Sequence, residues 1–364
     1  MDKIAVLGTG NSGLALAADL TLRGFPVNLG NLPQFASRVE ALRKSGGIRL
    51  QEHGQKTLVK IHRIGTDLPK LIGGVSHIFI AVPAYRHELF IRAIAPLLED
   101  HQYLVFISYF GALRFGHWQE KYRIRADVIP VEAQSLPYTA RRTAADTIHI
   151  IERKKRLFAS ALPARKNAEF CRSIAGIFPE ITAADTVLFS SLNNFNAVIN
   201  PPLMLANAER IASGVAPDWN LYAHGISEPV AQKILDVDRE RIQLAGRFQT
   251  RAIPFAQALL QLPAGAECNA EQFCHAIKNH LKLTDPRVPC PRSPDHRYLT
   301  ENIPFALVPF LTLAELAEIA TPALRSVVDS ASQILQRDFY AEGAKARELD
   351  IAGFSIPQLI SNIA

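Results

Sequence analysis

The sequence lacks the features that would assign it to several protein classes. Only four of its 364 residues are cysteines, and none of them forms a CxxC pair: Cys171, Cys268, Cys274 and Cys290. The spacing of six between Cys268 and Cys274 matches no common zinc-binding pattern. We therefore expect reduced thiols, no disulfide scaffold and no metal site.

Long hydrophobic runs are also absent. The longest candidate, Phe305–Ala320, is interrupted by Thr312, Glu315 and Glu318, so it predicts a buried helix and no membrane partner. At the N-terminus, a short strand-like segment leads into glycines where a signal peptide would have its apolar core. These patterns predict a cytoplasmic location.

Charge of one sign is in small excess. Lys and Arg number 40 against 34 for Asp and Glu, a net charge of +6. A net charge of +6 is too small for a dedicated nucleic-acid binder of 364 residues, so we expect no nucleic-acid partner. It fits either a mildly basic surface or the attraction of small anionic ligands.

The chain reads as two domains. Residues 1–185 alternate short apolar runs with helical patterns, which predicts an α/β domain with a Rossmann-type doubly wound parallel sheet. In residues 186–364 apolar residues recur at intervals of three and four, which predicts an all-helical domain. Its substrate-binding role is implied only by the family resemblance given below. The sequence leaves a monomer and a homodimer both open.

The expected elements follow from these patterns. Predicted strands are Lys3–Leu7, Val27–Leu29, Ser76–Val82, Tyr103–Ile107, Val128–Val131 and Thr147–Ile151. Predicted helices of the second domain are Thr186–Leu205, Glu228–Gly246, Pro254–Leu262, Glu271–Leu281, Ile303–Ile319 and Pro322–Gln336.

A glycine-rich segment, GTGNSG at 8–13, directly follows the first predicted strand and opens a helix. In that context GxGxxG predicts a dinucleotide site. The first glycine permits the tight turn, the second lets a pyrophosphate approach the backbone, and the third allows close helix–strand packing. The helix N-terminus offers N–H donors to the phosphates. The predicted cofactor-binding residues here are Gly8, Gly10, Asn11, Ser12 and Gly13.

The end of the second strand lacks the acidic residue that usually binds the ribose 2′-OH of NAD, since no acid occurs before Glu40. An anionic 2′-phosphate would be tolerated there, and Asn31, Gln34 and Arg38 could bind it. We therefore favour NADP and leave NAD open. The alternative role for Arg38 is that of a solvated helix residue.

The central apolar strand ends in the segment AVPA at 81–84. Ligands of doubly wound sheets bind at the carboxyl ends of such strands. Val82, Pro83 and Ala84 are therefore predicted to contact the cofactor, with Pro83 shaping the loop beneath the nicotinamide.

Four asparagines in the first predicted helix of the second domain fall on one helical face: Asn193, Asn196, Asn200 and Asn207. Buried amides need partners, which a substrate and a cofactor carboxamide would supply. The alternative is a solvated polar face.

The sequence resembles the octopine/nopaline (opine) dehydrogenase family. The resemblance rests on GTGNSG at 8–13, AVPA at 81–84, Glu132–Tyr138 with Arg141, NPP at 200–202, HRYLTEN at 296–302 followed by Pro304, and Arg337–Phe339 with Glu342–Gly343. It implies a Rossmann domain and a helical domain that together condense an amino acid with a 2-keto acid. The imine formed would be reduced by hydride from NAD(P)H, giving a secondary-amine dicarboxylate.

The catalytic positions depart from the family pattern. The family usually moves the proton through a His in a His-Pro pair, oriented by an Asp, whereas this chain has Asn200 and Asn302 at those positions. Asn cannot act as a general acid or base. Either Asn200 polarises the carbonyl while another group moves protons, or opine synthesis has been lost. His224 is the first candidate for that group and His296 the second.

The substrate carboxylates require cationic or amide donors. The resemblance assigns Arg297 to this role, with a salt bridge to Glu301 as its alternative. Asn196 and Arg141 are further substrate-binding candidates. Arg141 and its neighbour Arg142 are both weaker candidates than Arg297, and the alternative for both is a solvated surface role. Two other functions stay open, namely an NADP-dependent reductase of a simple keto acid and a dinucleotide-binding protein with an inactive site.

Overall fold

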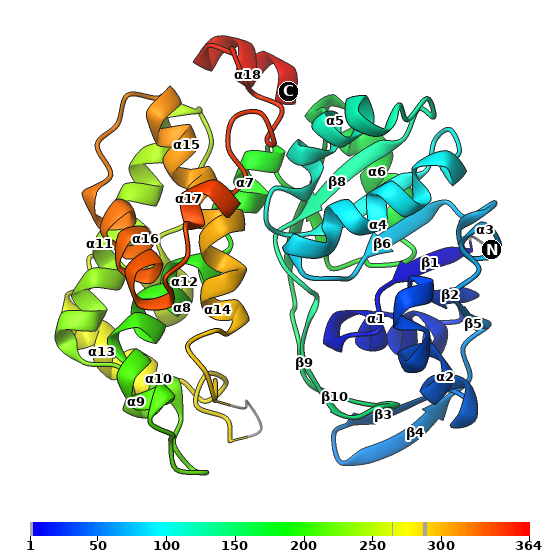
Figure 1. Cartoon of the computed structure of the whole chain (residues 1–364), viewed down its shortest axis with the longest axis horizontal. Coiled ribbons are helices and arrows are strands. Elements are labelled where there is room, and N and C mark those ends of the chain that lie inside the picture. Colours follow the sequence, from blue (N-terminus) through cyan, green and yellow to red (C-terminus); the bar gives the residue numbers. More distant parts are fainter. Residues whose placement is uncertain (1–2, 264, 287–289) are drawn as a thin grey trace. The chain divides into compact units, whose positions relative to one another are not determined.

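The computed structural model describes residues 3–263, 265–286 and 290–364. It forms two compact units (Figure 1), one of Met1–Ser191 with Asn362–Ala364 and one of Leu192–Ser361. The boundary expected at residues 185/186 lies just ahead of α7 (Val187–Leu192), the helix that ends where the second unit begins.

The N-terminal unit is built on an eight-stranded sheet with the order β12-β11-β8-β7-β6-β1-β2-β5. Its strands are β1 (Ile4–Leu7), β2 (Val27–Gly30), β5 (Arg63–Gly65), β6 (His77–Ile80), β7 (Tyr103–Ile107), β8 (Ile129–Ala133), β11 (Leu157–Ala161) and β12 (Ile181–Ala183). All neighbours pair in parallel except β8 and β11. The sheet thus has the doubly wound, mainly parallel form that the sequence predicted.

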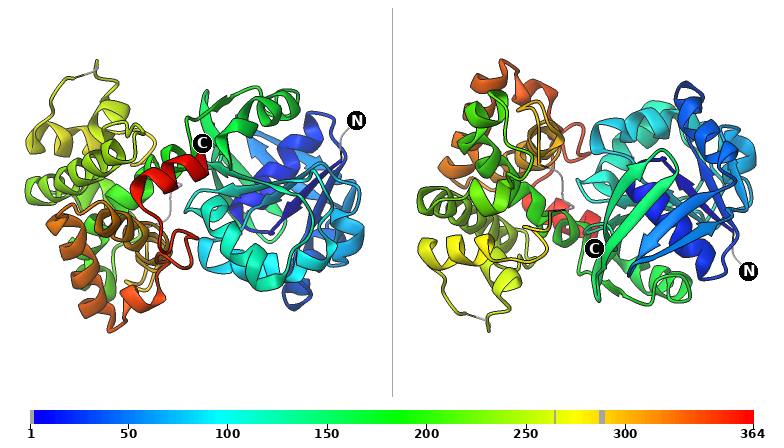
Figure 2. Two further views of the ribbon diagram at one scale, coloured as in Figure 1. Left: turned by 90° about the horizontal axis from the view of Figure 1, so that it is seen from above. Right: turned by 90° about the horizontal axis from the view of Figure 1, so that it is seen from below.

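Helices cover both faces of this sheet (Figure 2), which explains why β1, β2 and β6 are buried at every position. Tyr103 of β7 packs on Phe170 of α6, and Phe106, on the opposite face, packs on Trp118 of α5. The helices of this unit are α1 (Asn11–Leu22), α2 (Ala36–Lys44), α3 (Leu68–Ile72), α4 (His87–Ile94), α5 (Gly111–Tyr122) and α6 (Asn167–Ile174).

A second sheet, with the order β4-β3-β10-β9, corrects one prediction. Thr147–Ile151 is a strand, as expected, but as part of β10 (Thr147–Arg153) it lies outside the main sheet. It forms an antiparallel hairpin with β9 (Tyr138–Ala144) and pairs in parallel with β3 (Ile48–Glu52), which also pairs with β4 (Gln55–Val59). The short connection between β9 and β10 allows the antiparallel hairpin, and this pairing places β10 in the second sheet.

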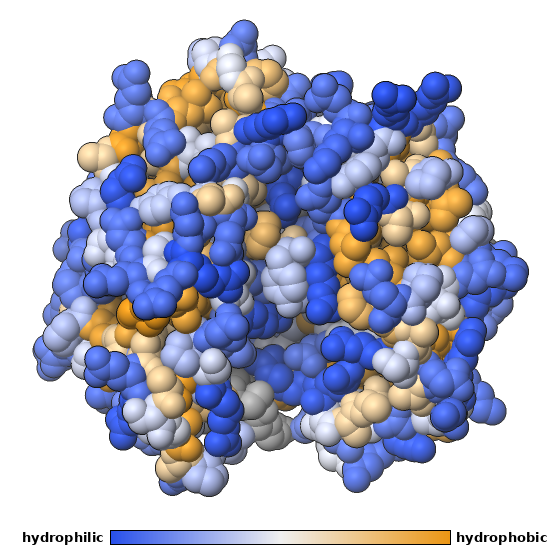
Figure 3. Space-filling view, in the orientation of Figure 1, coloured by the Kyte–Doolittle hydropathy of each residue, from blue (hydrophilic) through white to orange (hydrophobic). Residues whose placement is uncertain are grey.

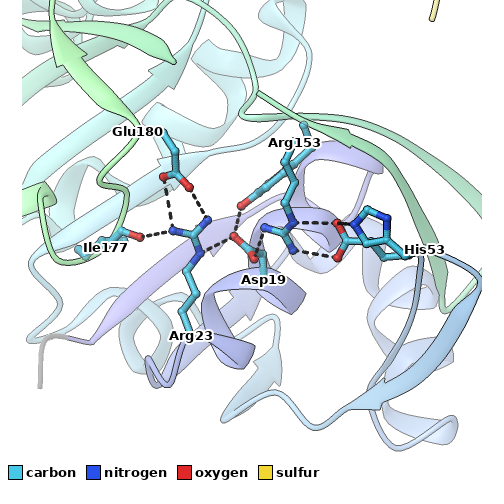
Figure 4. Close-up of polar contacts among 8 residues, drawn as sticks. Asp19, Arg23, His53, Arg153, Ile177 and Glu180 are labelled. Atoms are coloured by element: carbon cyan, nitrogen blue, oxygen red, sulfur yellow. Dashed lines mark hydrogen bonds and ion pairs between the residues drawn. The ribbon is translucent and has the colours of Figure 1, made fainter. Parts of the chain in front are cut away.

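A charged network fastens the second sheet to α1 (Figure 4). The buried carboxylate of Asp19 accepts hydrogen bonds from Arg23, from Arg153 of β10 and from the Tyr138 hydroxyl of β9. Hydrogen bonding to Glu52 and Asp19 raises the pKa of Arg153 above its ordinary value. The network thereby ties the β9–β10 hairpin to the helix that follows the glycine-rich loop.

The second unit is all-helical, as predicted. Its elements are α8 (Phe195–Ala206), α9 (Ala208–Ala212), α10 (Leu221–His224), α11 (Glu228–Arg247), α12 (Phe255–Leu260), α13 (Ala270–Lys278), α14 (Arg297–Thr300), α15 (Val308–Leu316), α16 (Pro322–Leu335), α17 (Phe339–Glu342) and α18 (Ile356–Ile363). Helix α8 lies at its centre, packed against α11, α14 and α16.

The helix expected over Thr186–Leu205 is interrupted where the side chain of Asn194 bonds locally and that of Asn193 bonds to distant groups. Asn194 caps α8 by accepting from the Asn196 N–H. The Asn193 side chain accepts from the Ile253 N–H at 2.7 Å and from the buried Arg241. Side-chain bonds of this kind compete with helix continuation.

The segment Arg297–Leu316 is one continuous helix with a π-helical turn at Ile303–Leu307. The missing N–H groups of Pro304 and Pro309 favour such a departure from α-helical bonding. Its length and hydropathy would suffice to cross a membrane, but 78% of the apolar window is buried inside the protein, as in a core helix. The buried helix predicted at 305–320 thus extends further toward the N-terminus.

Polar and charged side chains cover most of the face shown in Figure 3. Exposed large apolar side chains in the described part of the chain are Leu22, Leu58, Tyr85, Leu281 and Ile334. All four cysteines are free thiols, as the sequence predicted.

Candidate functional site

The glycine-rich loop connects β1 to α1 and is shaped by close backbone contacts. Gly8 has φ +120° and its N–H donates to the Gly30 carbonyl at 2.8 Å. A Cβ at Gly13 would lie 1.8 Å from the Gly8 oxygen, whereas one at Gly10 would meet nothing within 4 Å. Gly8 and Gly13 are therefore required by packing, and Gly10 leaves the open approach that a pyrophosphate needs.

The start of α1 is suited to an anion. No side chain caps it, and its first turn, with Asn11 and Ser12, contains no acid. A guanidinium from the second sheet lies against the loop: the Arg142 N–H donates to Asn11 Oδ1 at 3.0 Å, and its Nη1 donates to the Thr9 carbonyl at 3.4 Å.

The neighbouring Arg141 points elsewhere. Its Nη1 donates to the adjacent Ala140 carbonyl at 2.9 Å, and the side chain is half-buried. Of these two arginines, the structure thus places Arg142 against the glycine-rich loop.

The end of β2 carries an amide in place of an acid. Asn31 is buried; its Nδ2 donates to Thr9 Oγ1 at 2.7 Å and its Oδ1 accepts from the Leu32 N–H. This side chain supports the loop. Its predicted contact with a 2′-phosphate would therefore be limited to the hydrogen-bonding capacity of the amide that these two bonds do not use. Arg38 is exposed on α2, and Gln34 is also exposed.

The segment Val82–Ala84 follows β6, the strand beside β1, and a Cβ on Gly8 would meet its atoms. Two buried basic side chains contact the backbone carbonyls of this segment. Arg114 of α5 donates to the Ala84 carbonyl at 3.4 Å, and His87 of α4 contacts the Val82 carbonyl at 3.2 Å. Burial, and secondly the charge of Arg114, lower the pKa of His87 to about 3, so this ring is neutral at physiological pH.

The turn after β7 is strained. Ser108, Tyr109 and Phe110 have φ of 69°, 70° and 59°, a left-handed conformation that costs roughly 1–2 kcal/mol for each non-glycine residue. The fully buried Glu132 of β8 supports this turn, since its carboxylate accepts from the Ala112 N–H at 2.9 Å and from Ser191 Oγ at 3.1 Å. Burial raises the pKa of Glu132 to about 8.

In the helical unit, Asn200 has a phenol as its partner. It is buried in α8, and its Oδ1 accepts from the Tyr222 hydroxyl at 2.8 Å. With the amide oxygen engaged, Asn200 presents N–H donors to any further partner.

Asn302, at the entry of the π-helical turn, links two helices. Its Nδ2 donates to the Tyr298 carbonyl at 3.1 Å and to the Asn196 carbonyl of α8 at 3.2 Å. The side chain of Asn196 is exposed. Arg297 forms the ion pair with Glu301 that was its alternative role, at 2.5 Å, yet about half of the Arg297 side chain stays exposed.

The two candidate histidines engage backbone N–H groups. His224 is exposed and its Nδ1 accepts from the Asn220 N–H at 2.9 Å, whereas His296 caps α14 through the Tyr298 N–H. The side chain that the structure shows bonded to Asn200 is that of Tyr222, which lies two residues before His224.

The four asparagines do not form one stripe, because the helix expected to carry them is interrupted. Asn193 lies outside α8, and Asn207, just beyond its end, donates to the Leu203 and Gly225 carbonyls. Sequence reasoning missed Tyr222 and assigned no role to Arg86 and Arg114, because no motif marks them. Glu132 was quoted only as part of a motif.

Comparison with known families matches each unit separately. Residues 183–335 match the family described as "NAD/NADP octopine/nopaline dehydrogenase, alpha-helical domain". Residues 4–108 match the family described as "Ketopantoate reductase PanE/ApbA".

Curated relatives extend the similarity to nearly the whole chain. An opine dehydrogenase from Arthrobacter sp. (strain 1C) is 26% identical over 358 residues, 96% of each chain. Protein ocs from Agrobacterium vitis is 24% identical over 364 residues, covering 97% of this chain and 96% of that one.

Solved structures share the fold. Octopine dehydrogenase in complex with NADH and agmatine superposes with a TM-score of 0.78 at 19% identity, over 99% of this chain and 98% of that one. Yersinopine dehydrogenase with NADP+ bound gives a TM-score of 0.71 at 16% identity, over 100% and 98% of the two chains. These two structures contain bound NADH and NADP+, respectively.

Proposed function

Along nearly its whole length the chain is related to the opine dehydrogenase family, and from that premise we propose that it is an NADP-linked opine dehydrogenase. It would condense the amino group of an amino acid with a 2-keto acid and reduce the imine. The observation that carries this proposal is the similarity to a curated opine dehydrogenase over 96% of both chains.

The cofactor residues fit this activity. When bound, the dinucleotide supplies the hydride. Gly10 would leave room for its pyrophosphate, and the uncapped N-terminus of α1 and the guanidinium of Arg142 would supply N–H donors to it. The loop Val82–Ala84, anchored by His87 and Arg114, would contact the nicotinamide half.

On the substrate side, Arg297 is assigned to a carboxylate. Its ion pair with Glu301 orients the guanidinium, and about half of the side chain is exposed. Asn196 and Arg141 remain further substrate-binding candidates, and Asn302 positions α14 against α8.

Proton transfer requires a group other than Asn200. We assign to Asn200 the polarisation of the keto or imine group through its amide N–H, with the amide orientation set by Tyr222. Protons would move through His224 or solvent, because His224 is exposed and an imidazole can both accept and donate a proton. We also propose a cytoplasmic location.

A substrate matrix tests the proposal. Amino acids are paired with pyruvate and with 2-oxoglutarate, and NADPH oxidation is followed in the presence and absence of each partner. The proposal expects oxidation only when both an amino acid and a keto acid are present. If no pair of amino acid and keto acid causes NADPH oxidation under conditions where NADPH binds, an inactive site is favoured.

One observation favours a second candidate, the reduction of a simple keto acid. Residues 4–108 match the ketopantoate reductase family, and Asn200 and Asn302 are not titratable. Oxidation of NADPH with a keto acid alone, unaffected by any amino acid, would select this alternative.

A further inference from the structure

Two short 3₁₀ turns follow the strands on either side of β1. One, Pro33–Phe35, follows β2, and the other, Ala84–Arg86, follows β6. Because these strands run in parallel, both turns lie at the same edge of the sheet as the glycine-rich loop. A residue that joins the two turns therefore lies beside the predicted dinucleotide site.

Arg86 makes this connection. Its guanidinium carbon lies 4.7 Å from the centroid of the Phe35 ring and 5.6 Å from that of Tyr85. In the part of the chain that the structure describes, no carboxylate forms an ion pair with Arg86. A guanidinium stacked on a ring uses its face there and keeps its edge N–H groups for an anion.

The other basic groups of this region are less well placed. Arg38 is exposed on α2, and Arg43 donates to the Ile64 carbonyl at 3.0 Å. Asn31 is occupied with the loop. Arg86 is thus a half-buried, pre-oriented cation in a region whose neighbouring strand end carries no acid.

We propose that Arg86, held flat by Phe35, binds the 2′-phosphate of the cofactor adenosine and thereby selects NADP over NAD. This inference rests on the proposed function only in requiring a dinucleotide at the glycine-rich loop, and it does not depend on the opine reaction. Phe35 acts as a positioning residue, because its ring fixes the plane of the guanidinium. A charge-assisted contact of this kind predicts a loss of roughly 10- to 100-fold in NADPH affinity when the cation is removed.

Calorimetric titration of the full chain with NADPH and with NADH tests the proposal. Arg86→Met is expected to weaken NADPH binding by roughly 10- to 100-fold while NADH binding changes less than about twofold. Phe35→Leu should give a smaller loss that is also confined to NADPH. The matched control is Arg92→Met, an exposed arginine on α4, which should alter neither affinity.

Two smaller ligands isolate the phosphate. Competition by 2′,5′-ADP should weaken in Arg86→Met, whereas competition by 5′-AMP should not. Retained NADH binding shows that each variant is folded, and Arg86→Lys supplies a second variant that keeps the charge without the planar fork. Lys should recover part of the NADPH affinity.

Several results would overturn the inference. Equal losses for NADPH and NADH would make Arg86 a support of the loop only, and unchanged affinities would remove it from the site. A wild-type preference for NADH would also contradict it, as would failure of the wild type to bind either dinucleotide. If the wild type prefers NADPH but turns over no substrate pair, the opine proposal fails. The selection of NADP by Arg86 is then still tested by the calorimetric titrations with NADPH and NADH.

Discussion

In the N-terminal unit the predicted ligand contacts are mainly backbone groups, whereas in the helical unit they are side chains that already bond to one another. The loop at 8–13 offers helix N–H groups and an open Gly10. By contrast, Asn200 is held by Tyr222, Asn302 by backbone carbonyls and Arg297 by Glu301. A backbone site follows from local sequence, but a side-chain site depends on which distant partners meet.

The largest effect is expected at the glycine-rich loop. Gly13→Ala should abolish folding or dinucleotide binding, since its Cβ would lie 1.8 Å from the Gly8 oxygen. The matched substitution Gly10→Ala meets nothing within 4 Å, so it should keep the wild-type Tm and lose NADPH affinity. Calorimetry and thermal unfolding measure both. Equal Tm values for the two variants would show that the loop is not the packed backbone site described.

A second test concerns the buried carboxyl that supports the strained turn. Because burial raises the pKa of Glu132 from 4.5 to about 8, the unfolded chain ionises first as the pH rises. Stability from this group is full below pH 4.5 and falls by about 1.4 kcal/mol per pH unit up to about pH 8. Glu132→Gln should flatten this decline.

Denaturant unfolding between pH 6.5 and 8 measures this slope, since the pKa shift of His87 acts only below pH 6.5. Gln can still accept from the Ala112 N–H and donate to Ser191, so the variant should remain folded. Parallel slopes for wild type and Glu132→Gln would show that this carboxyl ionises normally in the folded protein.

The side-chain site of the helical unit predicts effects on turnover. Tyr222→Phe removes the hydroxyl that orients Asn200, so kcat should fall by roughly tenfold while the Kd for NADPH is unchanged. His224→Ala should lower kcat and change its pH profile. Steady-state kinetics of both variants distinguish the roles, and unchanged kcat in His224→Ala would remove it as a proton-transfer group.

The smallest effect distinguishes two adjacent arginines of β9. Arg142→Met should raise the Kd of NADPH and of NADH alike, by roughly three- to tenfold, because its guanidinium lies against Thr9 in the loop. Arg141→Met, whose side chain bonds to Ala140, should leave both Kd values unchanged and raise the KM of the substrates if its predicted role holds. The opposite assignment of effects would place Arg141 at the cofactor.

These contrasts explain which parts of the molecule could be predicted. The strand–loop–helix unit at 4–22 is formed by residues close together in sequence, so its glycines and apolar run were sufficient to predict it. The pairing of β3 with β10 joins residues far apart in sequence, and no short pattern marks it. Likewise, the interruption at Asn193 depends on Arg241 and Ile253, and the partner of Asn200 became apparent only from the packing of α10 on α8.

The most direct test of the central claim is isotope tracing of the product. The protein is incubated with a ¹⁵N-labelled amino acid, a 2-keto acid and NADPH deuterated at the transferable position, and the products are analysed by mass spectrometry. An opine dehydrogenase yields a secondary-amine dicarboxylate that retains the ¹⁵N and gains one deuterium. A deuterated hydroxy acid without ¹⁵N would contradict the account and identify the enzyme as a simple keto-acid reductase.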